Sequence, residues 1–293
     1  MLTLPLSDLG LLAAFFAVTF NTLFYIFSKY TATKVNNYKL TLLILGIGIL
    51  PMLIALIFTG QSATTSLLTM TYALIAGIFF GIGFALCFKS LQTEQVTNTS
   101  ALEPLQQLTI LLFGVLVLSE KLTVTQILAA FMIFVGVLLV SSSKGFKINK
   151  FLGPAILANL SWAAYWILLS YGIGGPQSNI FPTLLSRVTA FFVILAYSSI
   201  TGNLIESKKR RKVKSAILPL LLILTGFVDA GINLSFSFTL AFRVVALGSA
   251  IYATTPIFVA LIGRAIYKDK LTKSQLLGII MAVFGAAAIV LSL

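Results

Sequence analysis

The chain has 293 residues, of which 59% are hydrophobic and only 9% are charged, and its mean hydropathy is +1.06. A soluble protein carries about 25% charged residues, so this composition indicates an integral membrane protein. The absence of histidine and the presence of one cysteine, Cys87, exclude histidine-ligated metals, Ser-His-Asp triads and an intrachain disulfide. The net charge of +13 favours a role in membrane orientation over nucleic-acid binding.

Long apolar runs separated by short polar breaks predict an all-α integral membrane protein with ten transmembrane helices. A bilayer core of about 30 Å needs about 20 apolar residues per helix. The first predicted span lacks a basic n-region and a small-residue cleavage site, so we do not expect a removable signal peptide. In chain order the predicted spans are 9–29, 37–58, 68–90, 98–118, 123–142, 151–171, 180–201, 215–240, 247–267 and 272–292.

Basic residues are distributed unevenly between the two faces that ten spans define. Seventeen of the twenty lie on the face opposite the termini, Lys121 and Arg243 lie on the terminal face, and Arg187 lies within a span. The positive-inside rule therefore predicts a cell-membrane protein with both termini extracytoplasmic. The run "KKRRKVK" (208–214) is then a cytoplasmic loop, either a topology determinant or a binder of lipid or a partner.

One phrase is written twice. "EKLTVTQIL" begins at Glu120 and "DKLTKSQLL" at Asp269, and 269 − 120 gives an offset of 149. The phrases predict short turns in which a Thr and a Gln three positions later form a capping box, Thr123 with Gln126 and Thr272 with Gln275. The offset also aligns further pairs, namely Ser100-Ala101 with Ser249-Ala250, Gly114 with Gly263, Met132 with Met281 and Gly136 with Gly285.

The duplication predicts two five-helix repeats, 1–145 and 146–293. Because five is odd, the second repeat enters the membrane from the opposite side. Inverted repeats of this kind are typical of alternating-access transporters.

Two five-helix halves, each ending in an acid-Lys-Leu-Thr-x-x-Gln phrase and a helix with a central glycine, resemble the EamA type of the drug/metabolite transporter superfamily. The resemblance implies a central cavity lined by helices one, three and four and by their second-half equivalents. It also implies a polar or aromatic residue beside a proline in the fourth and ninth helices, which "ALEP" (101–104) and "YATTP" (252–256) match. Pro104 and Pro256 are three residues out of register at the offset of 149, so the halves differ there.

Three ionisable residues within spans are candidate functional groups, because each is costly to insert into a bilayer. Arg187 and Asp229 lie at similar depths in the seventh and eighth spans, which predicts an ion pair of either structural or functional role. Glu103 either faces the cavity, if its helix begins near Thr97, or complements a helix N-terminus, if the helix begins near Ala101. With Gln106 and Gln107 it forms one polar stripe, a candidate substrate contact.

The remaining cavity candidates are aromatic or polar side chains deep in the spans. Trp162, Tyr165 and Trp166 form a cavity wall or core packing, and Tyr252 and Thr255 adjoin Pro256. For Asn21, Asn159, Asn233 and Ser235 we expect interhelical hydrogen bonds before ligand contacts. The glycines of "GIFFGIG" (77–83) permit close helix packing, either mobile or static.

These features predict a non-enzymatic, alternating-access exporter or exchanger of small polar or amphipathic metabolites such as amino acids. Organic-cation or drug efflux is the alternative, which an acid in an aromatic cavity would suit. A receptor or scaffold and an intramembrane enzyme are the other classes. The expected partners are a small-molecule substrate and the lipid bilayer, not nucleic acid, with no cofactor and no metal, and the protein is a monomer or a homodimer.

Overall fold

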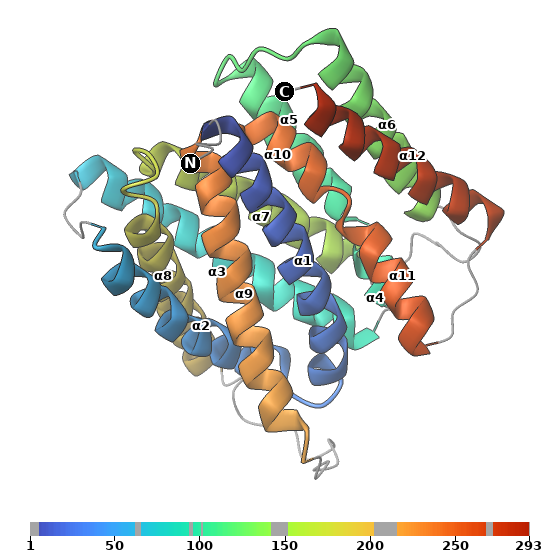
Figure 1. The fold of residues 1–293 in the computed structure, drawn as a ribbon. Helices are drawn as coiled ribbons and strands as arrows, with labels where there is room; N and C mark the ends of the chain where they lie inside the picture. The colour runs from blue at the N-terminus through green and yellow to red at the C-terminus, as the bar shows by residue number, and fades with distance from the viewer. Residues whose placement is uncertain are drawn as a thin grey trace.

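The computed structural model describes residues 6–61, 66–93, 96–100, 102–141, 152–201, 216–267 and 272–292. All the regular secondary structure in these ranges is helical (Figure 1). The predicted run 208–214, the residue Asp269 and the loop 142–151 lie outside them. The helices are α1 (Leu6–Ala32), α2 (Asn37–Thr59), α3 (Leu67–Thr93), α4 (Val96–Ser100), α5 (Glu103–Leu116), α6 (Val124–Ser141), α7 (Leu152–Gly172), α8 (Ile180–Ile200), α9 (Leu218–Ala241), α10 (Val245–Tyr252), α11 (Thr255–Tyr267) and α12 (Lys273–Leu291).

Within the described ranges, six helical stretches are long and apolar enough to cross a membrane. They correspond to α1, α2, α3, α8, α9 and the joined segment α10–α11. Large apolar side chains on the outer helices face away from the protein, such as Phe58, Phe131 and Phe284. Such exposure would be unfavourable in water over so wide an area, so the protein is a multi-pass membrane protein.

The fourth and ninth predicted spans are each broken into two helices. The breaks separate α4 from α5 and α10 from α11, and a proline lies second in the following helix, Pro104 or Pro256. Proline is favoured in a first helical turn, where its missing N–H costs no hydrogen bond. The helices after the breaks begin 255 − 103 = 152 residues apart, whereas α6 and α12 begin 273 − 124 = 149 apart. The breaks therefore follow the prolines rather than the overall repeat.

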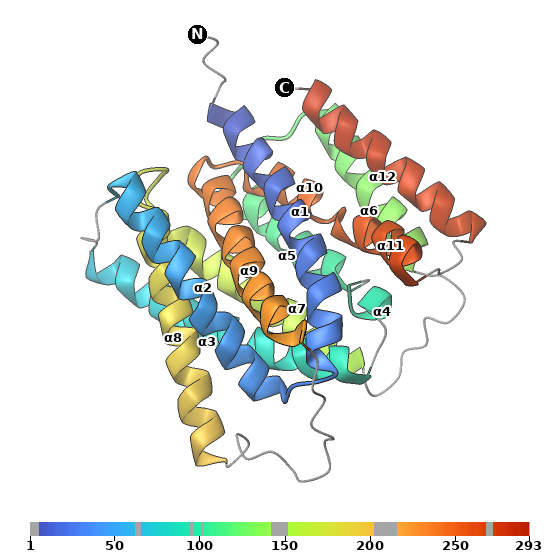
Figure 2. The ribbon, with the colours of Figure 1, turned by 60° about the horizontal axis from the view of Figure 1, so that its bottom comes forward.

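The first helix of each half packs against the third helix of the other half. α1 lies along α9, and its counterpart α7 lies along α3. α2 contacts α8, and α6 contacts α12, so these two pairs join equivalent helices of the two halves. Figures 1 and 2 show the α6–α12 pair at one edge of the bundle and the α2–α8 pair at the other. The core therefore forms between the halves rather than within each one.

The start of α1 and the end of α12 lie at the same end of the bundle, which we call the terminal end (Figures 1 and 2). The α2–α3 and α7–α8 connections meet each other, because Gln61 Nε2 donates to the Pro176 carbonyl at 2.8 Å and Asn179 Oδ1 at 3.0 Å. Near the ends of α9 and α1, the Thr239 hydroxyl donates to the Gly10 carbonyl at 3.0 Å. These contacts link the two halves of the chain.

The repeated turn after α5 makes one of these links. Thr123 and Gln126 form the predicted capping box, with reciprocal bonds of 3.0 and 3.3 Å. The side chain of Gln275, in the second copy, lies outside the described part of the structure. Glu120 makes a contact that the sequence did not predict. Its Oε1 and Oε2 accept hydrogen bonds from the N–H groups of Val245 (2.9 Å) and Ala246 (2.8 Å) at the start of α10. A carboxylate at a helix N-terminus satisfies unpaired donors and complements the helix dipole.

Burial raises the pKa of Glu120, an effect that the N–H groups of Ala246 and Val245 and the charge of Arg243 oppose. A carboxyl group with a raised native pKa binds protons more readily in the folded than in the unfolded protein. Its contribution to stability is therefore greatest below the ordinary glutamate pKa and decreases as the pH rises through the raised value.

We expect Glu120→Ala to destabilise the protein by about 0.5–2 kcal/mol, the usual cost of losing a helix cap. The difference in melting temperature from the wild type should be largest in mildly acidic buffer and smaller at alkaline pH. Lys121→Ala is the matched control, since that side chain is exposed beside Glu120. Equal melting temperatures for the Glu120 and Lys121 variants would show that the cap contributes nothing.

Candidate functional site

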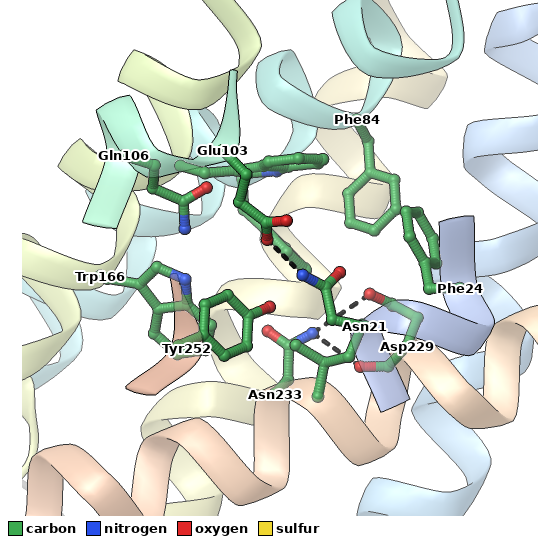
Figure 3. Close-up of a pocket in the computed structure, with 12 residues that line it drawn as sticks. Asn21, Phe24, Phe84, Glu103, Gln106, Trp166, Asp229, Asn233 and Tyr252 are labelled. Atoms are coloured by element: carbon green, nitrogen blue, oxygen red, sulfur yellow. Dashed lines mark hydrogen bonds between the residues drawn. The ribbon is translucent and has the colours of Figure 1, made fainter. Parts of the chain in front are cut away.

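A cavity lies near the middle of the bundle, between the two halves (Figure 3). The space open to the centre of a water molecule is about 30 Å³, room for about two waters. Sites that bind metabolites are typically about 300–1,000 Å³, so the cavity is contracted in this conformation. Its lining comes from α1, α3, α5, α7, α9 and α10: Asn21, Phe24, Phe80, Phe84, Glu103, Gln106, Trp162, Trp166, Asp229, Ile232, Asn233 and Tyr252.

Glu103 combines the two positions that its sequence left open. It is the first residue of α5, with Pro104 after it, and it is also buried in the cavity wall with 2% exposure. The break after α4 brings this helix N-terminus to the cavity, as broken helices of transporters do. Asn21 Nδ2, from α1, donates to Glu103 Oε1, and Thr255 Oγ1 lies 3.4 Å from the same nitrogen. Glu103 thus connects α5 to the first helix rather than only completing its own.

The predicted polar stripe on α5 is divided by the structure. Gln106 lines the cavity beside Glu103 (Figure 3), whereas Gln107 is buried outside its lining. Among the described residues, no group bonds to Glu103 Oε2, to Gln106 Oε1 or to either polar atom of the Gln107 amide. Buried polar groups normally have a hydrogen-bond partner, so these atoms have hydrogen-bonding capacity that the described residues do not use.

The predicted ion pair between Arg187 and Asp229 is present. Arg187 does not line the cavity: it lies behind the wall and donates through Nη1 to the carbonyls of Ile44 and Leu45 on α2, at 3.4 and 3.3 Å. Its guanidinium also lies 5.6 Å from the centre of the Phe80 ring. The arginine therefore joins α8 and α9 to the opposite half and holds the cavity carboxylate in place.

Asp229 has a second neighbour on its own helix. Asn233 Nδ2 donates to its backbone carbonyl at 2.8 Å and to Oδ1 at 3.3 Å (Figure 3). The Tyr165 hydroxyl donates to Asn233 Oδ1 at 2.7 Å, and its ring stacks on Phe80 at 4.4 Å. Tyr165 is thus a supporting residue and lies outside the cavity lining that we predicted for it.

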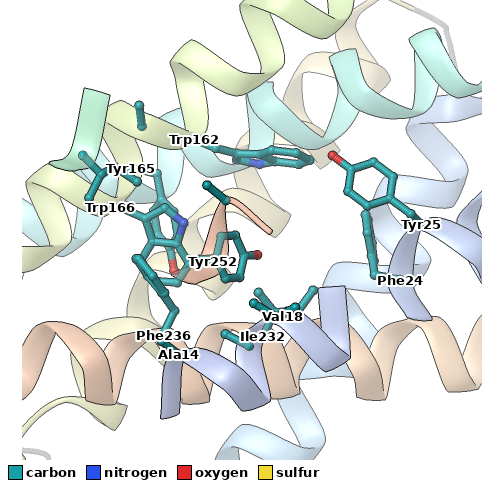
Figure 4. Close-up of a cluster of buried hydrophobic side chains, with 14 of the residues drawn as sticks. Ala14, Val18, Phe24, Tyr25, Trp162, Tyr165, Trp166, Ile232, Phe236 and Tyr252 are labelled. Atoms are coloured by element: carbon teal, nitrogen blue, oxygen red, sulfur yellow. The ribbon is translucent and has the colours of Figure 1, made fainter. Parts of the chain in front are cut away.

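Aromatic rings form most of the remaining wall. Trp162, Trp166 and Tyr252 line it from the second half and Phe24 and Phe84 from the first, with the Phe84 and Trp162 rings edge-to-face at 5.6 Å. Figure 4 shows Tyr25 and Tyr252 with their hydroxyl ends toward the space beside Trp162. Indole Nε1 of Trp162 has no acceptor among the described residues. The wall is apolar overall but carries polar atoms at its edge.

The glycines of α3 make this wall possible. A Cβ on Gly83 would lie 2.5 Å from the Trp162 ring, and a Cβ on Gly77 would lie 2.4 Å from the Ser186 carbonyl oxygen. Side chains at these positions would push α3 away from α7 and α8. The predicted close packing is therefore present at "GIFFGIG", and Gly83 leaves the space that Trp162 occupies.

Thr255 is the last predicted site residue. It is buried, and its hydroxyl donates to the Tyr252 carbonyl at 2.8 Å across the break between α10 and α11. It supports Tyr252 without lining the cavity.

For Asn21 and Asn233 the sequence analysis favoured helix–helix bonds over ligand contacts. Both make such bonds, with Glu103 and with Tyr165, and both also line the cavity. Asn21 lies one helical turn before Phe24, and Asn233 lies one turn after Asp229, and this spacing was the available signal.

No cluster of three or more metal-ligating side chains is found in the described ranges. The polar groups of the described lining include the carboxylates of Glu103 and Asp229 and the amides of Asn21, Gln106 and Asn233.

The protein is a helical membrane protein whose two halves pack against each other around a polar and aromatic cavity. Comparison with family models is more specific: residues 8–142 and 152–291 each match the EamA-like transporter family. The chain belongs to that family, which lies within the drug/metabolite transporter superfamily, and it is a membrane transporter.

One solved crystal structure, described only as that of a protein, superposes with a TM-score of 0.73. It is 17% identical in sequence, and the match covers 97% of this chain and 96% of the other. At that identity the likeness shows the fold alone. The comparison with curated proteins gives no match.

Proposed function

We propose that the protein is an alternating-access carrier of small metabolites in the cell membrane. Ten spans form two inverted halves, 1–145 and 146–293, and the central cavity is the substrate site. The observation that carries this proposal is Glu103, a buried carboxylate of a broken helix with a free oxygen at the interface between the halves. Fold maintenance alone gives no reason to keep an unpaired acid there.

The inverted arrangement is supported by the positions of the connections. At the terminal end, Gln61 bonds the α7–α8 connection and Glu120 bonds the start of α10. At the opposite end, Lys29 Nζ near the end of α1 donates to the Leu91 carbonyl near the end of α3 at 3.0 Å. Connections thus alternate between two ends, as they must when consecutive helices cross a bilayer.

The proposed substrates are small polar or amphipathic metabolites. Amino acids are the example that the sequence analysis gives. Organic cations are the second candidate, and the unpaired Glu103 in an aromatic wall favours them. A receptor or scaffold would need no contracted cavity between two pseudo-equivalent halves. An intramembrane enzyme would need reactive groups, and the chain has no histidine and one cysteine.

We infer that this conformation is closed at the terminal end. The bonds made by Gln61, Glu120 and Thr239 all cross between the halves at that end. Because each of these bonds joins one half to the other, we expect opening of the cavity toward the terminal side to break them. The carrier cycle therefore includes release of the Glu120 cap.

The charge asymmetry predicts that the terminal end is extracytoplasmic. Gln177 lies next to Pro176 and is exposed in the α7–α8 connection. The cysteine of Gln177→Cys should therefore be labelled in intact cells by a membrane-impermeant thiol reagent. In Thr33→Cys, an exposed position between α1 and α2 should be labelled only after permeabilisation, as should a cysteine near Arg210. Cys87 is buried and gives little background. The reverse pattern would overturn the orientation and leave the fold intact.

Counterflow in proteoliposomes tests the proposed function. A thermal-shift screen of purified protein against metabolite pools first identifies stabilising compounds. Vesicles preloaded with such a compound should then take up its labelled form faster than empty vesicles, and uptake should saturate. Protein that binds these compounds without saturable, trans-stimulated uptake would be a receptor or scaffold rather than a carrier.

A further inference from the structure

The central cavity contains one carboxylate that no cation balances. Asp229 is paired with Arg187, so these two charges cancel. None of the described basic side chains lies within ion-pairing distance of Glu103, whose one bond is from the neutral amide of Asn21. The first turn of α5 supplies partial positive charge but not a full unit. When Glu103 is ionised, the cavity therefore carries a net charge of about −1 in a setting of low dielectric constant.

Two unpartnered acceptors and one unpartnered donor, Trp162 Nε1, belong to described side chains that line the cavity. Glu103 Oε2 and Gln106 Oε1 are buried, have no donor among the described residues, and lie one helical turn apart on the same face of α5. Acceptors at this spacing suit a ligand with two or three N–H donors on one cationic nitrogen. A protonated primary amine has that arrangement, and a quaternary ammonium does not.

The rest of the wall suits the body of such a ligand. Phe24, Phe84, Trp162, Trp166 and Tyr252 surround the same space (Figures 3 and 4). Aromatic faces attract a cation and also remove apolar surface from water. A small amphipathic amine can therefore place its nitrogen against α5 and its apolar part against the rings.

A carboxylate on the ligand has no cationic partner in the described lining, because the unpartnered donor there, Trp162 Nε1, is neutral. The described lining contains no basic side chain. Arg187, behind the wall, is committed to Asp229 and to the carbonyls of Ile44 and Leu45. The ligand carboxylate of an amino acid would instead lie in a space shared with the unbalanced charge of Glu103, which repels it.

We propose that the cavity selects monocationic primary amines with a compact apolar body, and that Glu103 and Gln106 accept their N–H groups. This inference rests on the proposed carrier function and selects, within its substrate class, organic cations over amino acids. Zwitterionic amino acids and neutral compounds of the same shape are then poor substrates, and quaternary amines bind more weakly than primary ones.

Four probes with one phenethyl body separate these classes: phenethylamine, phenethyltrimethylammonium, phenylalanine and 2-phenylethanol. Their binding to purified protein is measured by thermal shift and by competition. Phenethylamine should bind tightest, and phenylalanine and 2-phenylethanol should bind about 30-fold or more weakly, as for a buried charge contact that lacks one partner. Glu103→Gln should lose the preference for the amine. Asp8→Asn makes the same change of acid to amide in the first turn of α1, away from the cavity, and should keep it.

The inference is overturned if phenethylamine does not bind, if phenylalanine or 2-phenylethanol binds equally well, or if Glu103→Gln retains the wild-type order. Counterflow keeps this result separate from the proposed function. A protein that exchanges other metabolites without regard to their charge remains a carrier, and only its amine selectivity is refuted. A protein that binds amines but exchanges nothing has the inferred site without the proposed function.

Discussion

Arg187→Ala is expected to destabilise the protein by about 3–5 kcal/mol, the cost of leaving one partner of a buried ion pair uncompensated. Asp229 would remain 2% exposed without a cation. The Ile44 and Leu45 carbonyls would lose their guanidinium donor, which weakens the contact between α2 and α8. A thermal melt in detergent measures this loss.

The double mutant Arg187→Ala/Asp229→Ala should lose clearly less stability than the two single losses added together, because the second substitution removes the charge that the first leaves unpaired. Arg264→Ala is the matched control, since that arginine is exposed near the end of α11. Strict additivity in the cycle would mean that the pair contributes no coupling energy, despite its contact in the structure.

Glu103→Gln should reduce the ratio of maximal uptake rate to half-saturation concentration by about 30-fold or more, the expected effect of removing one partner of a buried charge contact. The melting temperature should change little, because glutamine keeps an acceptor for Asn21 and removes an unbalanced buried charge. The measurement pairs proteoliposome uptake across mildly acidic to mildly alkaline pH with a melt of the same preparation.

Glu103→Asp is the conservative comparison for this prediction. It keeps an ionisable carboxylate but shortens the reach to Asn21. If the Glu103 carboxylate acts in transport, wild-type uptake should vary with pH, and Glu103→Asp should show partial uptake that still varies with pH. Wild-type kinetics for Glu103→Gln over the whole pH range would return the residue to a capping role at the start of α5. In that role the substitution costs only about 0.3–1 kcal/mol of stability.

The sequence predicted the helical framework well, because long apolar runs and the doubled turn are local signals. It also predicted the Arg187–Asp229 pair, since two costly charges at similar depth in consecutive spans have few other partners. Five of the nine predicted site residues line the cavity: Glu103, Gln106, Trp162, Asp229 and Tyr252.

The remaining four could not be placed from periodicity alone. Gln107 and Gln106 are adjacent on α5, and the rotation of the helix at the break after α4 decides which of them faces the cavity. Arg187 and Tyr165 lie one layer behind, because the partners that hold them there, on α2 and α9, come from distant parts of the chain. Thr255 turns its hydroxyl to a local carbonyl at the second break.

The Glu120 cap shows the same limit in another form. Its acid-Lys phrase indicates a turn at the membrane surface, but its partners Val245 and Ala246 are 125 and 126 residues away. Only the packing of one half against the other brings α10 to this turn. This contact at the terminal end is therefore a property of the assembled halves and not of either repeat.

The most direct test of alternating access is the reactivity of a single cysteine in the cavity from each side of the membrane. Ile232→Cys introduces it on α9, in the cavity lining, in a Cys87→Ala background that has no other cysteine. An impermeant thiol reagent is applied to right-side-out and inside-out vesicles, and Leu45→Cys, fully buried, serves as the unreactive control.

The account predicts that Ile232→Cys reacts from both sides. Adding Glu120→Ala, which removes the cap at the terminal end, should raise the rate from the terminal side and lower it from the opposite side. Reaction from one side only, or an increase from both sides together as in a continuous pore, would contradict alternating access at this cavity.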